Sequence, residues 1–390
     1  MAGSSTVVCP YLPKEIVEKI LLMLPHESII TFKRVCKLWY NITKNESFIS
    51  DHINRHSKSN ATTSLLLFHH LNDSLYTISY DHDQDHDNRN DYLIPCVVEQ
   101  SLPTSDLLHS IERLYFLRNQ ARGLHCNGII AFPKNDDSKI IFFNPTLKQF
   151  KILHTQFRPE FVSIGHGFGY DRRTDLYKYV DICQSNYNGA TIFKARVCTL
   201  WISNSGGVSS RWREIDMVNP SQNKFDNIGV YLKSVCYWLN LHEQCLVSFD
   251  MCDEKFGMIP LPCDTKFSTT CQAKLTIWKG ESLVLLFMRK PFGSKFLLNC
   301  EMWMMVEEND NTYWRRHLTI GPIKEYEFLR CLHFWNHEEL LMEGRDVASR
   351  YEFLMSYNIR TKKIRRLNFS LIGLHFSTLY SKSLVSLSNN

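Results

Sequence analysis

The side chains of this chain that are best suited to bind a metal lie in three short stretches. His52 and His56 are four residues apart, as are His333 and His337, and the tract DHDQDHDNRND at 81–91 contains five Asp and two His. Zinc sites use three or four protein ligands, and neither histidine pair has a third ligand nearby in sequence. We therefore expect no metal at either histidine pair. We expect a solvated acidic loop at 81–91, which in an alternative role binds a cation or a basic client protein.

Two further stretches have the composition of anion-binding segments. GHGFG at 165–169 has the glycine content of a phosphate loop, but YDRRTDLYKYV follows it and indicates a strand hairpin rather than the required helix. RTKKIRR at 360–366 places five cations in seven residues, which indicates a solvated turn between two strands. A nuclear-import signal or a docking point for an acidic surface is the alternative for this run. We expect no nucleotide site at 165–169.

The thirteen cysteines are scattered and include no CxxC pair. Several lie inside apolar runs such as VCYWL and RVCTLW, where buried reduced thiols are usual. The odd number and the lack of an export signal indicate a reducing compartment. No cysteine has a flanking motif or a recognisable histidine partner, and no catalytic triad or carboxylate pair is recognisable. We therefore expect no catalytic residue, no metal and no cofactor.

Composition indicates a folded protein that acts outside membranes. Of 390 residues, 44% are apolar and 22% are charged, as in globular proteins. No apolar run approaches the roughly 18 residues of a membrane helix. The net charge of +5 is small for this length and does not indicate nucleic-acid binding. We expect a cytoplasmic protein, with the nucleus as a second location.

The elements that position these side chains begin with the only long helical segment of the chain. Ile16, Ile20 and Leu24 recur every four residues, which predicts an amphipathic helix. Pro13 suits the first turn of that helix, and Pro25 ends it and can start a second. The region is therefore expected to be a small helical domain.

Two more helices are expected after the second. Val35, Leu38, Trp39 and Ile42 form a third apolar stripe, and Asn45 is placed to cap a fourth helix. Four short helices in about 45 residues bury too little surface to hide all of these side chains. Exposed apolar patches usually mark a protein interface. We expect Leu38 and Ile42 inside the bundle and much of the remainder at a partner.

This segment resembles an F-box. The Leu12-Pro13 start, the Leu24-Pro25 break and the segment VCKLW at 35–39 fall at that family's spacing, whereas His26 replaces the small apolar residue usual in plant members. The resemblance implies docking on the Skp-type adaptor of a cullin–RING ubiquitin ligase. It implies these docking residues: Leu12, Pro13, Ile16, Ile20, Leu21, Leu24, Pro25, Ile29, Val35, Cys36 and Trp39.

Two alternatives apply to the helical segment. Its apolar side chains can form only the interior of a helical bundle, with no partner. It can also be compared with a DNA-binding helix-turn-helix, which needs a basic and polar second helix to read base edges. The stretch IITFKRVCKLW is too apolar for that role.

Beyond residue 63 the chain reads as strands and turns with a period near 50 residues. Landmarks in its strand–turn–strand segments are 59, 47, 56 and 52 residues apart: Asn144, Ser203, Asp250, Val306 and Asn358. Such a period predicts a β-propeller with blades of about four strands, and 64–390 has room for about six. We expect SLVSL at 383–387 to close the ring against the first blade. A two-sheet β-sandwich is the alternative fold.

The β body resembles the F-box-associated, kelch-like domain of plants. CNGIIAF, IIFFNPTLKQFKIL, HGFGYDRRTDLYKYVDI and SSRWREID stand in that family's order. The layout, including WMMVEE and WRRHLTIGPI, is similar to S-locus F-box proteins, which recognise pollen-rejection ribonucleases. The resemblance implies a mainly β chain with a small α domain: an F-box over 9–56, a linker over 57–63 and a propeller-like recognition domain over 64–390.

These observations predict a non-catalytic substrate receptor of an SCF-type ubiquitin ligase. The head would bind the Skp-type adaptor, and through it a cullin, while the body presents a client protein, in one version a secreted-type ribonuclease of self-incompatibility taken up into the cytosol. We expect client-reading loops at 81–91, 184–190 and 217–228. The alternative is a β-propeller enzyme or glycan-binding lectin with an incidental helical cap and a ligand cluster in the propeller mouth.

Overall fold

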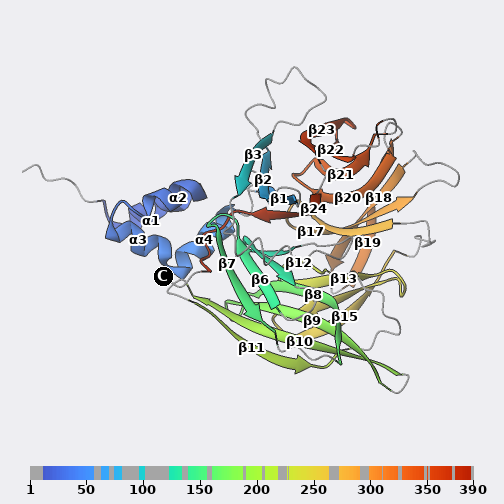
Figure 1. Ribbon diagram of the computed structural model, residues 1–390, viewed down its shortest axis with the longest axis horizontal. Helices are drawn as coiled ribbons and strands as arrows, with labels where there is room; N and C mark the ends of the chain where they lie inside the picture. Colours follow the sequence, from blue (N-terminus) through green and yellow to red (C-terminus); the bar gives the residue numbers. More distant parts are fainter. Residues whose placement is uncertain are drawn as a thin grey trace, which may run out of the picture. The chain divides into compact units, whose positions relative to one another are not determined.

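The computed structural model divides the chain into two compact units, Met1–Ser59 and Asn60–Asn390, which we call the head and the propeller (Figure 1). Among the described residues, no helix is long and apolar enough to cross a membrane. The structure describes residues 12–56, 63–69, 74–80, 96–101, 123–133, 139–155, 160–187, 190–203, 207–217, 226, 228–262, 272–289, 298–309, 311–323, 327–346, 349, 352–370 and 374–387.

The described part of the head is helical, as the apolar spacing predicts. Its helices are α1 Lys14–Met23, α2 His26–Phe32, α3 Lys37–Lys44 and α4 Glu46–His56. Pro13 directly precedes α1 and Pro25 directly precedes α2. Asn45 caps α4, because its Oδ1 accepts a hydrogen bond from the Ser47 amide at 2.8 Å. The expected helix starts are therefore confirmed.

The interior of the head is small. It is built from Val17, Leu21, Ile29, Ile42, Phe48 and Ile49. Ile42 lies in this interior as expected, but Leu38 does not, since 40% of it is exposed. Leu38 falls in the first turn of α3, which begins at Lys37, whereas the buried Ile42 lies one turn further along the helix. The prediction for Leu38 was wrong.

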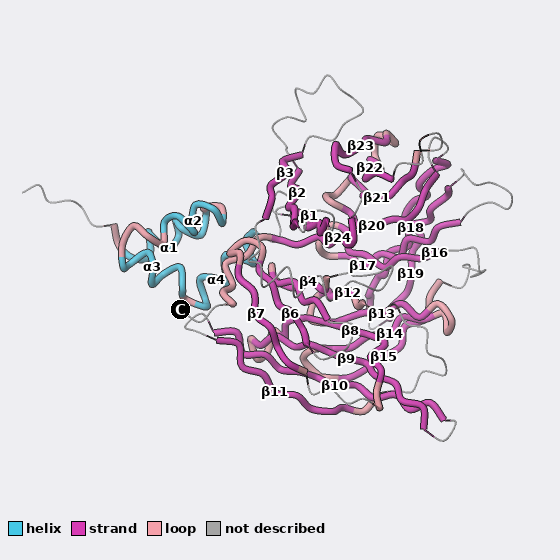
Figure 2. The backbone as a smooth tube through the Cα atoms, in the orientation of Figure 1, coloured by secondary structure: helices cyan, strands magenta, loops and turns pink. Residues whose placement is uncertain are grey.

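The propeller consists of six four-stranded antiparallel sheets (Figures 1 and 2). Its strands are β1 Thr63–His69, β2 Ser74–Tyr80, β3 Cys96–Ser101, β4 Leu124–Cys126, β5 Ile129–Pro133, β6 Lys139–Asn144, β7 Gln149–His154, β8 Val162–Asp171, β9 Leu176–Tyr187, β10 Ala190–Ser203, β11 Gly207–Ile215, β12 Val230–Leu232, β13 Val235–Asn240, β14 Cys245–Asp250, β15 Lys255–Pro260, β16 Gln272–Trp278, β17 Ser282–Arg289, β18 Leu298–Glu308, β19 Asn311–Ile323, β20 Glu327–Phe334, β21 Glu339–Arg345, β22 Glu352–Asn358, β23 Ile364–Ser370 and β24 Leu374–Ser381. The six-bladed propeller is confirmed, and the β-sandwich alternative is not the fold.

In five blades, the first strand of a four-stranded meander lies nearest the axis, and in the first blade β24 takes this inner place beside β1. Strand β4 contacts β24, β8 contacts β4, and β12 contacts β8 and β16. Strand β12 also contacts β4, although the blade that starts with β8 stands between their blades in the chain. Inner strands therefore approach one another at the axis.

The landmark residues mark one position in the blade. Ser203 ends a third strand and Val306 lies within one. The other three end third strands and cap the turn that follows: Asn144 Oδ1 accepts from the Thr146 amide at 2.9 Å, Asp250 Oδ1 from Cys252 at 2.7 Å and Asn358 Oδ1 from Arg360 at 3.0 Å. Asn and Asp side chains favour turns through such bonds. The period in the sequence is thus the recurrence of this turn.

The ring is closed by β24, not by the last apolar run. Strand β24 pairs antiparallel with β1, with Thr63 opposite Ser381, and completes the first blade. Residues 383–387 lie instead against the second blade, where Asn144 Nδ2 donates to Ser383 O at 3.1 Å and to Val385 O at 2.7 Å. The expected closure by 383–387 is corrected: a strand can complete the ladder of the first blade, and this run is not a strand.

The GHGFG stretch lies in β8 and permits close packing between blades. A Cβ atom on Gly167 would lie 2.6 Å from Trp238, and one on Gly169 would clash with Tyr231. Trp238 Nε1 donates to His166 O at 2.9 Å. The glycines therefore make room for the aromatic side chains of the next blade, and the expected hairpin is the β8–β9 pair.

Candidate functional site

The head presents most of the predicted docking residues at its surface. Seven are exposed: Leu12, Pro13, Ile16, Ile20, Pro25, Val35 and Cys36. Leu24 and Trp39 are half-buried. Leu21 and Ile29 are fully buried inside the head, where they support the surface from beneath. Ile16 and Ile20 stand one turn apart on α1, so they share a face with each other.

Three exposed apolar side chains were missed as docking candidates. Met23 is 62% exposed at the end of α1, and Leu38 and Tyr40 are exposed on α3. Met23 lies seven residues after Ile16 and so extends the α1 stripe. The apolar period contained this signal, but the family motif draws attention to Leu24-Pro25 instead.

Two aromatic contacts and a pair of lysines lie at the surface of α2 and α3. Lys44 Nζ lies 4.6 Å from the centre of the Tyr40 ring, and the Phe32 and Trp39 rings meet at 5.4 Å. Burial lowers the pKa of Lys33, and the nearby charge of Lys44 lowers it further. Lys33, Lys44 and the Tyr40 ring therefore lie close enough to influence one another electrostatically.

Three histidines of the head, His26, His52 and His56, form what we call the histidine cluster. The His52 ring centroid lies 4.6 Å from that of His26 and 4.2 Å from that of His56. The sequence shows only the α4 pair; His26 joins it because α2 packs within reach of α4. Among the described residues, no group of three or more His, Cys, Asp or Glu side chains is arranged to hold a metal ion.

The basic run 360–366 divides into a turn and a strand. Arg360, Lys362 and Lys363 are exposed in the turn between β22 and β23. In the strand, Arg365 Nη2 lies 2.6 Å from Glu339 Oε1. The predicted solvated turn is therefore observed, while the strand part is paired inside its blade. The acidic tract 81–91 lies outside the described residues.

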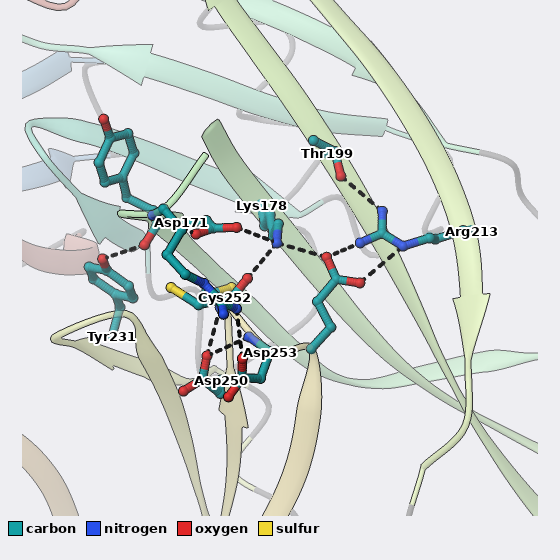
Figure 3. Close-up of polar contacts among 12 residues, drawn as sticks. Asp171, Lys178, Thr199, Arg213, Tyr231, Asp250, Cys252 and Asp253 are labelled. Atoms are coloured by element: carbon teal, nitrogen blue, oxygen red, sulfur yellow. Dashed lines mark hydrogen bonds and ion pairs between the residues drawn. The ribbon is translucent and has the colours of Figure 1, made fainter. Parts of the chain in front are cut away.

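An ionic network joins the third and fourth blades (Figure 3). Lys178 of β9 lies 2.7 Å from Asp171 Oδ2 and 2.7 Å from Glu254 Oε1, and it also donates to the Met251 carbonyl. Glu254 in turn binds Arg213 of β11. Burial alone would raise the pKa of Asp171, but the hydrogen bond from Lys178 helps to hold this pKa well below its usual value. The network fixes two blades to each other.

Thiol and phenol side chains lie on the inner strands β4 and β12 and on β9. Cys126, Tyr177 and Tyr231 lie close together, and burial raises the pKa of each, with added effects of their neighbours. The cysteines whose side chains the structure describes, nine in all, are free. A thiol with a raised pKa is a poor nucleophile. The rival enzyme or lectin hypothesis requires a ligand cluster in this region, and the described residues provide none with metal-binding geometry.

The predicted client-reading loops are mostly not loops where the structure describes them. Residues 184–187 belong to β9 and Ala190 begins β10, so the expected connection between blades is the end of a hairpin within one blade. In 217–228, the Asp226 amide donates to Leu239 O at 2.8 Å and Ile228 bridges to His166. The described end of that segment is therefore attached to the fourth blade and to β8.

Comparison with known proteins identifies both units. The family model of the F-box domain matches residues 10–51, and that of the F-box associated beta propeller domain matches residues 71–386. F-box protein At3g20690 of Arabidopsis thaliana is 26% identical over 342 residues, which cover 85% of each chain. F-box/kelch-repeat protein At3g23880 of the same plant is 24% identical over 390 residues, or 96% of this chain and 95% of the relative.

Solved structures add little to this comparison. A chain of the nidogen/laminin complex aligns with 81% of this chain at 10% identity and a TM-score of 0.41, which is too weak to bear on fold or function. The two family matches and the relatives support a substrate-adaptor role in an SCF complex. Because the propeller match alone spans more than half of its length, the chain belongs to the F-box proteins that carry an F-box associated β-propeller domain.

Proposed function

We propose that the head docks on a Skp-type adaptor and that the propeller presents a client protein for ubiquitination. One observation carries the proposal: large apolar side chains remain exposed on the head, among them Ile16, Ile20 and Val35. Each such anchor contributes roughly 1.5–3 kcal/mol when a partner buries it. A few anchors together therefore offset a large part of the entropic cost of association. Cullin recruitment then follows through the adaptor.

The chain in this proposal contributes no catalytic group. It raises the effective concentration of client lysines near a ubiquitin-charged enzyme, as any linked pair of binding modules does. The packed inner strands and the inert buried thiols support this role. They give less support to the rival function, an enzyme or lectin with a ligand in the propeller mouth.

The course of the chain favours one end of the propeller for the client. Thr63, where the described chain enters the propeller, pairs with Ser381, whose amide donates to His125 beside the β4–β5 turn. The β9–β10 hairpin and the β13–β14 turn lie at the opposite end of their blades. We infer that the client is read at this opposite end, away from the point where the chain enters the propeller at Thr63.

The identity of the client is a narrower hypothesis. The proposal that it is a pollen-rejection ribonuclease rests on the resemblance of the layout to S-locus F-box proteins. The names of the Arabidopsis relatives mention F-box and kelch repeats and no client. Affinity enrichment with the proteasome inhibited, followed by mass spectrometry, identifies the client directly.

The docking proposal is tested by co-purification with a recombinant plant Skp-type adaptor. The full chain should retain the adaptor, and the double variant Ile16→Asp/Val35→Asp should lose at least about 100-fold in affinity, because two anchors are replaced by charges. Met258→Asp on the propeller is the matched control, since Met258 is similarly exposed. A chain that starts at residue 60 and still retains the adaptor would refute docking through the head.

A further inference from the structure

Two histidines of α4 bond to the end of α1. His52 Nε2 lies 2.9 Å from Leu24 O, and His56 Nε2 lies 3.3 Å from Leu22 O. The last carbonyls of a helix have no partner within that helix, so an imidazole N–H that donates to them stabilises the helix end. Both rings must therefore carry a proton on Nε2, and in the neutral form Nδ1 carries only a lone pair.

The surroundings of His52 favour its neutral form. The residue is fully buried, and its Nδ1 has no hydrogen-bond partner among the described residues. A second proton would sit on this Nδ1, next to the rings of His26 and His56, with the Phe48 ring stacked at 5.9 Å. Burial lowers the pKa of His52, the Leu24 carbonyl partly opposes this, and the charge on His56 lowers the pKa further.

The helices around His52 contribute few other charges. From α1 it meets the carbonyls at the helix end, from α2 it meets His26, and on α4 itself it meets His56. Asp51 and Arg55 of α4 are exposed. From α3, Lys44 lies over the Tyr40 ring instead.

The helix end that these histidines hold belongs to the proposed docking surface. Met23 is the last residue of α1, Leu24 follows it, and Ile20 lies one turn before Leu24. The geometry of this surface thus depends on the two bonds that the Nε2 atoms of His52 and His56 make to the end of α1. Loss of these bonds would free the end of α1 from α4 and disorder the exposed stripe.

We propose that His52 and His56 are positioning residues of the docking surface and that docking is consequently acid-sensitive. This inference rests on the adaptor docking proposed above. When the end of α1 is released from α4, His52 takes up a proton near the ordinary histidine pKa of 6.5. In the closed head, burial holds the pKa of His52 below that value. Docking is therefore at full strength above that pH and is lost as the pH falls below it.

The test measures adaptor affinity of the full chain at pH 7.5, 6.5 and 5.5 by biolayer interferometry. Because His52 takes up one proton on release, the Kd should rise by up to about tenfold per pH unit below 6.5. In His52→Gln the side-chain amide can still donate to Leu24 O but does not titrate. This variant should bind within about threefold of the natural chain at pH 7.5 and should lose most of the acid dependence.

The matched control is His242→Gln, since His242 is exposed on the propeller. It should keep the pH profile of the natural chain, and any titration of the adaptor itself is common to all variants. An unchanged profile in His52→Gln, or a Kd of the natural chain that does not rise at pH 5.5, would overturn the inference. A natural chain that fails to bind at pH 7.5 refutes the adaptor docking instead.

Hydrogen exchange of the full chain provides a second readout that needs no variant and no adaptor. After correction for intrinsic rates, amides of 14–24 should lose about tenfold in protection between pH 7.5 and pH 5.5, while amides of β13 and β14 should not. Equal protection of 14–24 at both pH values would show that the histidine cluster does not release α1, and the inference would fail.

Discussion

The head and the propeller distribute apolar side chains in opposite ways. Among the described residues, seven large apolar side chains are exposed on the head and five on the much larger propeller. The exposed positions of the head gather on α1 and around α3, whereas those of the propeller are spread over several blades: Val162, Ile192, Trp201, Met258 and Tyr313.

The difference follows from how much of its apolar surface each unit can bury by itself. The blades cover one another around a ring, so almost every apolar face has a neighbour within the same unit. Four short helices have no such possibility, and their interior holds only a few side chains. The head thus keeps apolar side chains exposed at its surface, while the described blades of the propeller cover most of theirs.

The largest expected loss of stability comes from the buried ionic network between two blades of the propeller. Lys178→Met leaves Asp171, which is 1% exposed, without its cation, and Glu254 with Arg213 alone. Removing one partner of a buried ion pair costs about 3–5 kcal/mol. Denaturant unfolding of the full chain, followed by hydrogen exchange of β9 and β14 peptides, measures this loss.

The matched control for Lys178→Met is Lys194→Met in the same blade. Lys194 pairs with Glu214 at 3.1 Å, but both side chains are about 40% exposed. An exposed pair contributes less than about 1 kcal/mol, so this variant should be close to neutral. Equal losses in the two variants would show that the network of Figure 3 is not a buried joint between blades.

The next prediction compares a buried and an exposed side chain on the same helix of the head. Leu21→Ala removes a fully buried side chain and should destabilise the head by about 2–5 kcal/mol. Ile20→Ala, one residue earlier and 44% exposed, should change stability by less than about 0.5 kcal/mol. Hydrogen exchange of 14–56 in the full chain measures both losses.

In adaptor binding, measured on the folded fraction of each variant, the order of these two effects should be reversed. Ile20→Ala should weaken docking by roughly tenfold, because an anchor is truncated without harm to the fold. If Ile20→Ala destabilised the head as much as Leu21→Ala does, the exposed stripe would be structural, and the contrast between head and propeller would disappear.

A smaller effect concerns the tail that lies on the second blade. Asn144→Ala removes two donors to the carbonyls of Ser383 and Val385 as well as the cap of its own turn. Asp250→Ala removes only the corresponding turn cap in the fourth blade. We expect Asn144→Ala to cost about 1–3 kcal/mol and more than the Asp250 variant. Limited proteolysis should likewise cleave the C-terminal tail faster in Asn144→Ala than in Asp250→Ala.

Much of the fold could be predicted because the chain repeats itself. Turn-capping residues such as Asn144, Asp250 and Asn358 recur with the blades, and the apolar period of α1 fixes one helix face. Local rules sufficed for the caps at Pro13 and Asn45. Such features depend on neighbours in sequence, which a single sequence shows.

The remainder depends on contacts between distant segments. In the sequence, no pattern shows that β24 closes the ring and that the apolar run at 383–387 after it does not. His26 meets His52 only because two helices pack together, and whether Ile20 or Leu21 faces inward depends on where α4 lies. For the same reason, the family motif indicated the helical segment but not the exposure of Met23 and Leu38.

The smallest expected effect compares two glycines of the propeller that both have positive φ. Gly280 has φ +67° and nothing within 4 Å of an added Cβ, whereas a Cβ on Gly128, with φ +79°, would clash with Ser383 of the tail. Gly280→Ala should therefore cost only the backbone strain of about 1 kcal/mol. Gly128→Ala adds the displacement of the tail and should cost clearly more in denaturant unfolding. Equal losses would show that the tail yields easily at this point, and that the propeller is less complete there than its buried contacts indicate.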